Sequence, residues 1–408
     1  MKFITKTKLN FMSLVILLCY SSVSSAVVPL QNQQLKSLIK NVTALHPLVQ
    51  AAKERLKQAS FDAKAKKQPL YNPEISVEYE SNVEETSTIG LSQTIDWSNK
   101  RRAMSLIGEK NKAVAEAQLR LTKQQVAATF LKKINQYQTS RLTSQLNLKQ
   151  SSTLDQFVDI AKQRLKAGDI SQIEFDLALL AAGEIQMNSA KIQADYFSAE
   201  TELTAFLDFE KIQIPEISIK LIHLDNTSVE KLLIDHPRIK QLRLKTQTAN
   251  AQIKLARRQK SADPTLSFNA GKEGDEDIYS LGFSIPLMVR NNFSAEVDTA
   301  IANAAAVEQE YRNSYRNILV ALKTSKKSLR LTFMAYQNWL KQSSFGLEQR
   351  GTLLQKVWKS GDLSTTDYLI QIQQTLDTQI SAAQLKADVI NTWIDYLMAS
   401  GQIDSWLN

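Results

Sequence analysis

The sequence predicts a mainly α-helical fold with a small β part, built from two repeats that each join a β-hairpin to a long helical hairpin. Landmarks in the first half of the chain recur in the second half at offsets of 190 to 193 residues. Each half contains two short segments in which apolar and polar residues alternate, the pattern of half-buried strands. Each half then continues for roughly 110 residues without proline, as long helices require.

The duplication rests on four landmarks that occur twice, in the same order. They are His46-Pro47 and His236-Pro237, Asn72–Ser76 and Asp263–Ser267, Gly90–Ser92 and Gly282–Ser284, and Ala167–Ser171 and Ser360–Ser364. A drift of three residues over four landmarks is not expected by chance. We therefore divide the chain into repeat 1 at residues 27–207, an equatorial connector at 208–229 and repeat 2 at 230–408.

The first 26 residues are typical of a secretory signal peptide. Three lysines precede the apolar segment 11–20, and small residues lead up to Ala26, after which we expect cleavage. The single cysteine of the chain, Cys19, lies inside this segment, and Leu18 before it argues against lipidation. The signal predicts export from the cytoplasm of a mature chain without thiols.

A short helix opens each repeat, at residues 48–68 and 238–261. Each follows a His-Pro pair, and proline is tolerated in the first helical turn because the N–H there has no intrahelical partner. Each helix is expected to end before the next proline, Pro69 or Pro264. Between the repeats, isoleucines alternate with polar residues in the connector, which predicts a small strand there.

A β-hairpin follows each short helix, at residues 71–97 and 264–287. In the first hairpin Ile75, Val77 and Tyr79 alternate with polar residues, and the second hairpin repeats the pattern from Leu266. The turns, at 81–85 and 272–276, are polar and acidic. Each hairpin therefore has one apolar and one polar face.

A long helical hairpin completes each repeat, at residues 98–207 with its tip near 168 and at 288–400 with its tip near 361. Apolar residues of the second stretch recur at spacings of three, four and seven, as in a coiled coil. Glycine at each tip suits the left-handed residue that ends a helix. Ser171 and Glu174 form a predicted capping box for the helix that follows, and Ser364 and Asp367 form its shorter analogue.

Composition argues against several classes of function. The formal net charge is +9, or +6 without the three lysines of the signal, and the basic residues form no dense block that would suggest nucleic acid as a partner. The histidines, His46, His223 and His236, have no second ligand at metal-site spacing. Neither a phosphate-binding glycine loop nor a cysteine nucleophile is present, so we expect no enzymatic activity, no metal site and no cofactor.

The two hairpins fit either of two environments. Their apolar faces match lipid, and Tyr71 and Trp97 at the helix-side ends match a membrane-interface belt of aromatic residues. Four strands cannot close a barrel, so strands in a membrane would require more than one copy: two copies give eight strands and three give twelve, and the pattern does not choose between them. A small soluble sandwich with its apolar face against helices fits the alternation equally well.

The chain resembles the TolC family of outer-membrane efflux proteins over nearly all of its mature length. The resemblance is carried by the duplication, by Asn72–Glu78, by Leu91–Arg102 and by the tips Arg164–Ser171 and Ser360–Ser364. Within Leu91–Arg102, the stretch with Gln93, Trp97 and Lys100-Arg101 is similar to the heavy-metal-efflux branch, the CzcC- and CusC-like factors.

The resemblance implies a homotrimer, with a β-barrel of four strands from each copy in the outer membrane and an α-barrel through the periplasm. It also implies a periplasmic adaptor protein and an inner-membrane pump, of the RND type, as partners. By position, it places Asp367 and Glu174 as gate or constriction candidates, and both also fit plain helix capping. Gly168, Asp169, Gly361 and Asp362 become candidates for contact with the adaptor.

These expectations combine into a passive exit duct for substrates delivered by the pump. The alternative from another class is a secreted coiled-coil scaffold of the periplasm, which explains the helices but leaves the paired strands without a role. The sequence leaves the cargo open among metal ions, drugs and polypeptides. It also leaves the identity of the pump and adaptor open.

Overall fold

The computed structural model describes residues 23–81, 83–207, 214–219, 222, 227–342 and 347–408. The chain divides into two compact units. The helical unit comprises residues 1–46, 124–227 and 321–408, and the sheet unit comprises residues 47–123 and 228–320. Residues 1–22 of the predicted signal peptide, including Cys19, lie outside the described residues, as does His223.

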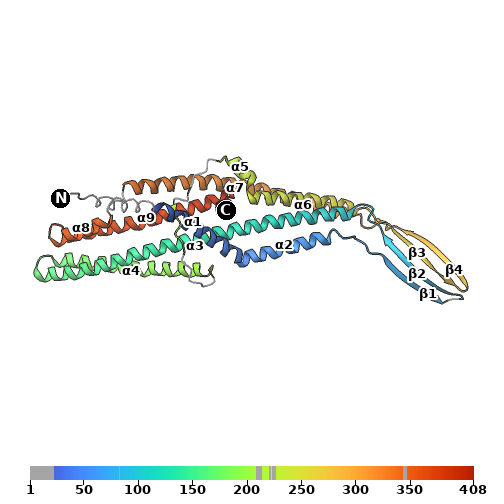
Figure 1. The fold of residues 1–408 in the computed structure, drawn as a ribbon, viewed down its shortest axis with the longest axis horizontal. Helices are drawn as coiled ribbons and strands as arrows, with labels where there is room; N and C mark the ends of the chain where they lie inside the picture. The colour runs from blue at the N-terminus through green and yellow to red at the C-terminus, as the bar shows by residue number, and fades with distance from the viewer. Residues whose placement is uncertain (1–22, 82, 208–213, 220–221, 223–226, 343–346) are drawn as a thin grey trace, which may run out of the picture. The chain divides into compact units, whose positions relative to one another are not determined.

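Helices dominate both units (Figure 1). The helices are α1 (Val23–Leu45), α2 (Pro47–Ala65), α3 (Lys100–Ala167), α4 (Gln172–Thr204), α5 (Val229–Asp235), α6 (Pro237–Gln259), α7 (Ser294–Gln342), α8 (Leu347–Lys359), α9 (Thr365–Ser400) and α10 (Ile403–Leu407). The strands are β1 (Glu74–Ser81), β2 (Glu85–Thr94), β3 (Thr265–Glu273) and β4 (Glu276–Ser284). No described helix combines the length and the apolar character needed to cross a membrane.

The sheet unit contains one antiparallel sheet with the strand order β1-β2-β3-β4. The two predicted hairpins thus join edge to edge, through nine residue pairs between β2 and β3 that run from Thr86–Glu273 to Thr94–Thr265. β1 and β4 form the outer edges, and within the described residues neither edge is paired with a further strand. The sheet is therefore open on both sides.

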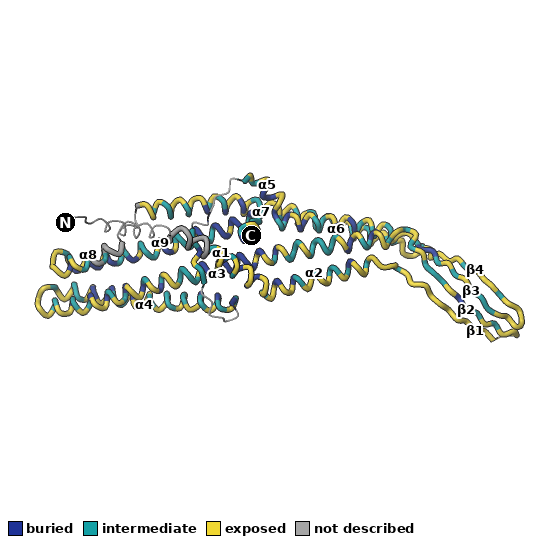
Figure 2. Tube along the Cα trace, in the orientation of Figure 1, coloured by how far each residue is buried: buried dark blue, intermediate teal, exposed yellow. Residues whose placement is uncertain are grey.

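Figure 2 shows that most of β1 and β4 is exposed, and one face of the sheet is both apolar and exposed. The register places Ile75, Leu91, Phe268 and Leu281 in one row across all four strands. Their exposed fractions are 75%, 53%, 47% and 87%, so the helices of the chain do not cover this face. The sandwich alternative, in which the apolar face packs on helices, is wrong for this sheet.

The opposite face is polar and closely packed. Its middle row joins Ser76, Gly90, Asn269 and Ser280, and the amide of Asn269 donates to the Ser280 hydroxyl at 3.1 Å. A Cβ atom on Gly90 would lie 2.1 Å from the Asn269 side-chain oxygen, so this row has no room for a larger residue. Along the outer strand, the same face carries the carboxylates Glu74, Glu78 and Glu80.

The helical unit has its own core, in which α3 and α4 pack with α8 and α9. Ten buried residues form it: Leu154, Phe157, Ala161, Ala178, Ala181, Ile185, Trp358, Tyr368, Leu369 and Ile372. Both helical hairpins contribute, so the two repeats share one core at this end of the unit. Burial of these large side chains from water supplies its main stabilisation.

The connector and several short helices differ from the sequence expectation. In the connector, residues 214–219, 222 and 227–229 are described, and none of them lies in a strand. Pro215 and Ile217 instead bond to the side chain of Gln138 on α3, which competes with strand pairing. Helices α1, α5 and α10 were not expected, and they lack the repeat landmarks on which the expectation rested.

Candidate functional site

The two hairpin tips end their first helices in the same way. Gly168 and Gly361 have φ angles of +83° and +87°, as the sequence predicts for left-handed residues. The N–H of Asp169 donates to the Arg164 carbonyl at 2.9 Å, and the N–H of Asp362 donates to the Val357 carbonyl at 3.2 Å. These bonds are those of a Schellman motif, so both tips are tight turns fixed by the backbone. All four predicted tip residues are exposed.

The two gate candidates each occupy the third position of the helix that follows the tip. Glu174 accepts the Ser171 N–H at 2.8 Å while its own N–H donates to the Ser171 hydroxyl, which completes the predicted capping box. Asp367 accepts the Ser364 hydroxyl at 2.7 Å. The bond from the Ser171 backbone, followed by that from its hydroxyl, holds the pKa of Glu174 below its usual range. Capping is thus present at both positions.

An aromatic cluster joins the two tips inside the helical unit. The Phe157 ring lies 4.5 Å from that of Trp358 and 5.1 Å from that of Tyr368, between ring centroids. Burial raises the pKa of Tyr368 to about 12. The guanidinium carbon of Arg164, near the end of α3, lies 4.8 Å from the centroid of the Trp358 ring. The same guanidinium donates to the carbonyls of Trp358 and Lys359. Arg164, at the first tip, therefore caps the last carbonyl groups of α8, the helix that leads into the second tip.

Several large apolar side chains are exposed on the helices that follow the two tips. On α4, Ile173, Leu177, Leu180 and Met187 are 72%, 41%, 71% and 73% exposed, and their spacing places them along one side of the helix. On α9, Ile370 lies one turn after Asp367 and is 46% exposed. Large apolar stripes of this kind are typical of surfaces that another protein chain covers.

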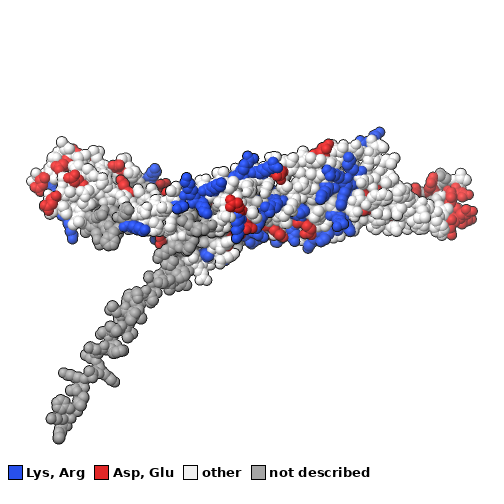
Figure 3. Space-filling model, turned by 90° about the horizontal axis from the view of Figure 1, so that it is seen from above, with Lys and Arg blue, Asp and Glu red and all other residues white. Residues whose placement is uncertain are grey.

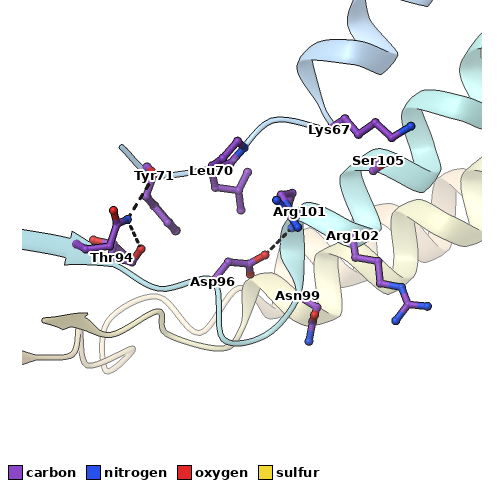
Figure 4. A pocket seen from close by; sticks show the side chains of 11 residues that line it. Lys67, Leu70, Tyr71, Thr94, Asp96, Asn99, Arg101, Arg102 and Ser105 are labelled. Atoms are coloured by element: carbon purple, nitrogen blue, oxygen red, sulfur yellow. Dashed lines mark hydrogen bonds between the residues drawn. The ribbon is translucent and has the colours of Figure 1, made fainter. Parts of the chain in front are cut away.

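The two predicted interface aromatics lie at the base of the sheet, Tyr71 just before β1 and Trp97 just after β2, and Figure 4 shows Tyr71. Tyr71 donates its hydroxyl to Asp263 at 2.7 Å, and Lys100 pairs with the same carboxylate at 2.9 Å. The hydrogen bond to Asp263, followed by burial, raises the pKa of Tyr71 to about 12. The Trp97 side chain forms no hydrogen bond with the residues that the structure describes, and it is 65% exposed. Of the two, Trp97 has the exposure expected of a membrane-interface aromatic, whereas Tyr71 is tied to the junction.

A pocket of about 500 Å³ opens beside this junction. Asp96 lies at its floor and accepts the N–H groups of Lys100 and Arg101, so it closes the first turn of α3 (Figure 4). The wall includes Leu70 and the basic residues Lys67, Arg101 and Arg102. The pocket combines an apolar wall with three cations.

The described residues hold no group of three or more histidine, cysteine or acidic side chains that could bind a metal. His46 packs its ring 5.3 Å from that of Phe206. His236 caps α6, with its Nδ1 accepting the Arg238 N–H at 3.2 Å. Both contacts belong to helix starts and packing.

Sequence reasoning missed the partners that organise these sites. Phe157, Trp358 and Arg164 were not singled out, although an aromatic residue just before a predicted tip glycine is a usable signal. The Lys100–Asp263 pair was also missed. Asp263 in the second repeat corresponds to Asn72 in the first. This change from a neutral to a charged residue within a repeated motif could have indicated an ion pair at Asp263.

Comparison with known proteins finds outer-membrane channels among the structures that are similar to this fold. Residues 38–207 match the family model described as outer membrane efflux protein. Comparison with curated protein sequences finds no match. Among solved structures, the CmeC outer membrane channel of Campylobacter jejuni aligns with a TM-score of 0.75 at 13% identity, covering 91% of this chain and 85% of that one.

Two further structures agree. The outer membrane protein VceC of Vibrio cholerae aligns with a TM-score of 0.72 at 18% identity, over 90% of this chain and 96% of that one. CusC, whose structures concern folding and transmembrane channel formation, aligns with a TM-score of 0.71 at 16% identity. The alignment covers 90% of this chain and 92% of the CusC chain. The chain therefore has the TolC-like fold of these channels, and its first repeat carries the sequence pattern of the outer membrane efflux protein family. The family and these neighbours are channel proteins, not enzymes.

Proposed function

We propose that this protein is the outer-membrane channel of a tripartite efflux system, completed by three copies of the chain. The exposed apolar face of the open four-stranded sheet carries this proposal. In water, such a face would promote aggregation, and its free edges would pair with other strands. In lipid, the apolar face contacts acyl chains without penalty, but each unpaired N–H or C=O group at the sheet edges costs several kcal/mol. Only a closed ring of strands removes both costs.

The proposed stoichiometry rests on closure and on resemblance. Four strands are fewer than the roughly eight that a barrel requires, so neighbouring copies must supply the rest. Three copies give a barrel wide enough for a channel, whereas two give a filled interior. The exposed stripes at the hairpin tips, including Leu180 and Met187, are available for contact between copies along the helices.

The proposal is tested on the purified protein in detergent and in planar bilayers. We expect an oligomer that resists heating in detergent and discrete conductance steps after insertion. A monomer that stays soluble without detergent and gives no conductance would support the scaffold alternative instead.

For the gate, we propose that Asp367, with Glu174, constricts the duct where the tips of the copies converge. Asp367 is exposed, so its charge is available to face the lumen while its carboxylate caps α9. Asp367→Asn keeps an acceptor for Ser364 but removes the charge, and we expect single-channel conductance to rise about twofold or more.

Two variants control this experiment. Asp367→Ala removes the charge and the cap together, whereas Asp388→Asn removes an exposed charge farther along α9. If Asp367→Asn conducts like the wild type and only Asp367→Ala loses stability, the carboxylate acts as a cap alone.

The partners that we propose are a periplasmic adaptor and an inner-membrane pump of the RND type. The exposed tips around Gly168 and Gly361 are the proposed adaptor contact. The one cysteine of the sequence, Cys19, lies in the predicted signal peptide, so Asp169→Cys or Asp362→Cys in a Cys19→Ser background provides a single thiol for cross-linking. Heavy-metal cations are the first cargo to test, because the stretch with Gln93, Trp97 and Lys100 resembles the metal-efflux branch. Growth of a deletion strain on metal salts and on dyes separates this cargo from drugs.

A further inference from the structure

Basic side chains gather at the end of the sheet where all four strands meet the helices (Figure 3). The register brings the start of β1, the end of β2, the start of β3 and the end of β4 to this one end. The four junctions there carry ten cations, which we call the junction belt: Lys64, Lys66, Lys67, Lys100, Arg101, Arg102, Arg257, Arg258, Lys260 and Arg290. The belt thus spans the full width of the sheet.

The aspartates of these junctions are already engaged. Asp62 pairs with Lys66, Asp96 closes the first turn of α3, and Asp263 binds Lys100 and Tyr71. In the described part of the chain, no carboxylate lies within ion-pair distance of seven of the ten belt residues. These are Lys64, Arg101, Arg102, Arg257, Arg258, Lys260 and Arg290. The belt therefore carries a positive charge that the fold itself does not neutralise.

The belt borders directly on exposed apolar surface. Trp97 and Ile95, between β2 and the belt, are 65% and 42% exposed, and Leu287 and Val289, after β4, are 77% and 85% exposed. A long basic side chain at such a border lays its methylene stem along the apolar surface and keeps its charge at the polar boundary. The guanidinium of arginine also matches a phosphate group with two parallel hydrogen bonds.

The opposite end of the sheet has the opposite charge. The turns there carry Glu80, Glu84, Glu85, Glu273, Asp275, Glu276 and Asp277, with Lys272 as the one cation among them. Figure 3 shows this acidic group at the far end of the sheet. The apolar face therefore lies between a basic border and an acidic border.

We propose that the junction belt binds the phosphate groups of anionic phospholipids in the leaflet on the helix side of the sheet. This inference rests on the proposed function, because it needs the sheet to lie in a bilayer. The pocket beside Tyr71, at about 500 Å³, has Leu70 and the cations Lys67, Arg101 and Arg102 in its lining, and its one carboxylate, Asp96, is bonded to the N–H groups of Lys100 and Arg101. The remaining cations lie across the other junctions, as a surface of many headgroups requires.

The test compares lipids on the whole protein purified in neutral detergent. Phosphatidylglycerol or phosphatidylcholine is titrated, and the lipid concentration that gives half of the thermal stabilisation of the oligomer is measured. We expect the anionic lipid to act at a lower concentration than the zwitterionic one. Inorganic phosphate at the same concentrations should give no stabilisation, and equal stabilisation by it would overturn the proposal in favour of a free-anion site.

A belt variant removes four of the unpaired cations: Arg101→Gln, Arg102→Gln, Arg257→Gln and Arg290→Gln. Lys100 and Arg258 are kept, because they bond to Asp263 and to the Asn99 carbonyl. Each cation that contacts a headgroup is expected to shift the phosphatidylglycerol midpoint about fivefold, equivalent to about 1 kcal/mol. The phosphatidylcholine midpoint should stay unchanged.

A matched control removes four exposed cations of α7 that border no strand: Arg316→Gln, Lys323→Gln, Lys327→Gln and Arg330→Gln. It should keep the preference for anionic lipid, and its loss in both variants would mean that net charge alone matters. A second measurement needs no variant: the wild-type preference should weaken when the salt concentration rises from about 0.05 M to about 0.5 M.

Conductance in planar bilayers separates lipid binding by the belt from channel formation by the barrel. If the wild type conducts but shows no preference for anionic lipid, the belt proposal fails and the channel proposal stands. If the wild type neither inserts nor conducts in any lipid, both fail together.

Discussion

At the scale of single residues, Glu174 and Asp263 illustrate two roles of a carboxylate, which are to close a helix and to neutralise a largely buried cation. Asp263 does the latter: its side chain is 3% exposed, and that of its partner Lys100 is 13% exposed. A buried pair gains little over apolar packing, but removal of one partner leaves an unpaired charge. The junction is therefore expected to lose stability when one member of the pair is replaced, and much less when both are replaced.

Lys100→Met is therefore expected to destabilise the fold by about 3 kcal/mol, because Asp263 keeps only the hydroxyl of Tyr71. The double variant Lys100→Met/Asp263→Leu should recover most of this loss. The free energy of unfolding in detergent, followed by circular dichroism, measures both. Equal losses in the single and double variants would show that the pair is not coupled.

Glu174 shows the former role and makes the tip sensitive to acid. Its pKa is lower in the folded chain, so its contribution to stability is present above its ordinary value of 4.5 and is lost as the pH falls through the folded pKa. Glu174→Gln keeps the capping geometry without the charge. We expect the difference in melting temperature between wild type and Glu174→Gln to shrink as the pH falls below 4.5. A difference that stays constant with pH would contradict this assignment.

At the scale of elements, the turns and caps were readable from the sequence, and the contacts between elements were not. The tip glycines and the capping box follow from local chemistry, and the structure confirms both. The edge-to-edge pairing of β2 with β3 joins residues more than 170 positions apart, and no local pattern specifies such a pairing. The same holds for Arg164 and Trp358, whose contact depends on how two hairpins pack.

The tip glycines allow a prediction with an internal control. At Gly361 a Cβ atom would have no neighbouring atom within 4 Å, so Gly361→Ala should cost only the strain of a left-handed residue, about 1 kcal/mol. Gly183 is equally unobstructed but lies inside α4, where Gly183→Ala should stabilise by about 0.5–1 kcal/mol. Melting temperatures of the two variants should therefore move in opposite directions.

The two faces of the sheet allow a prediction about lipid contact. Leu91 lies on the apolar face and Ser92 on the polar face of the same strand. If the apolar face contacts lipid, Leu91→Lys should reduce assembly in the outer membrane, since a lysine there costs about 2–4 kcal/mol near the bilayer midplane. Ser92→Lys should be tolerated. The amount of heat-resistant oligomer in membrane fractions measures the difference, and equal effects of both variants would contradict a lipid-facing sheet.

At the scale of the whole molecule, the duplication predicted the fold class, mainly helical with a small sheet, and the similarity to solved TolC-like channels agrees with it. The number of copies could not be read from one chain, because the described edges of β1 and β4, which pair with no further described strand, fit more than one number of neighbouring copies. The cargo could not be read either, since the repeated landmarks and the strand alternation specify the fold and not the solute that passes.

The column of Glu74, Glu78 and Glu80 on the polar face of β1 has a consequence for a closed barrel. Rotational symmetry would repeat this column once per copy, so fixed negative charge would be spaced evenly around the inner wall, while the middle row of the neighbouring strands carries only glycine, serine and asparagine. Such a wall draws in positive solutes and repels negative ones without holding any of them tightly. The sign of a permeating ion would then matter more than its identity.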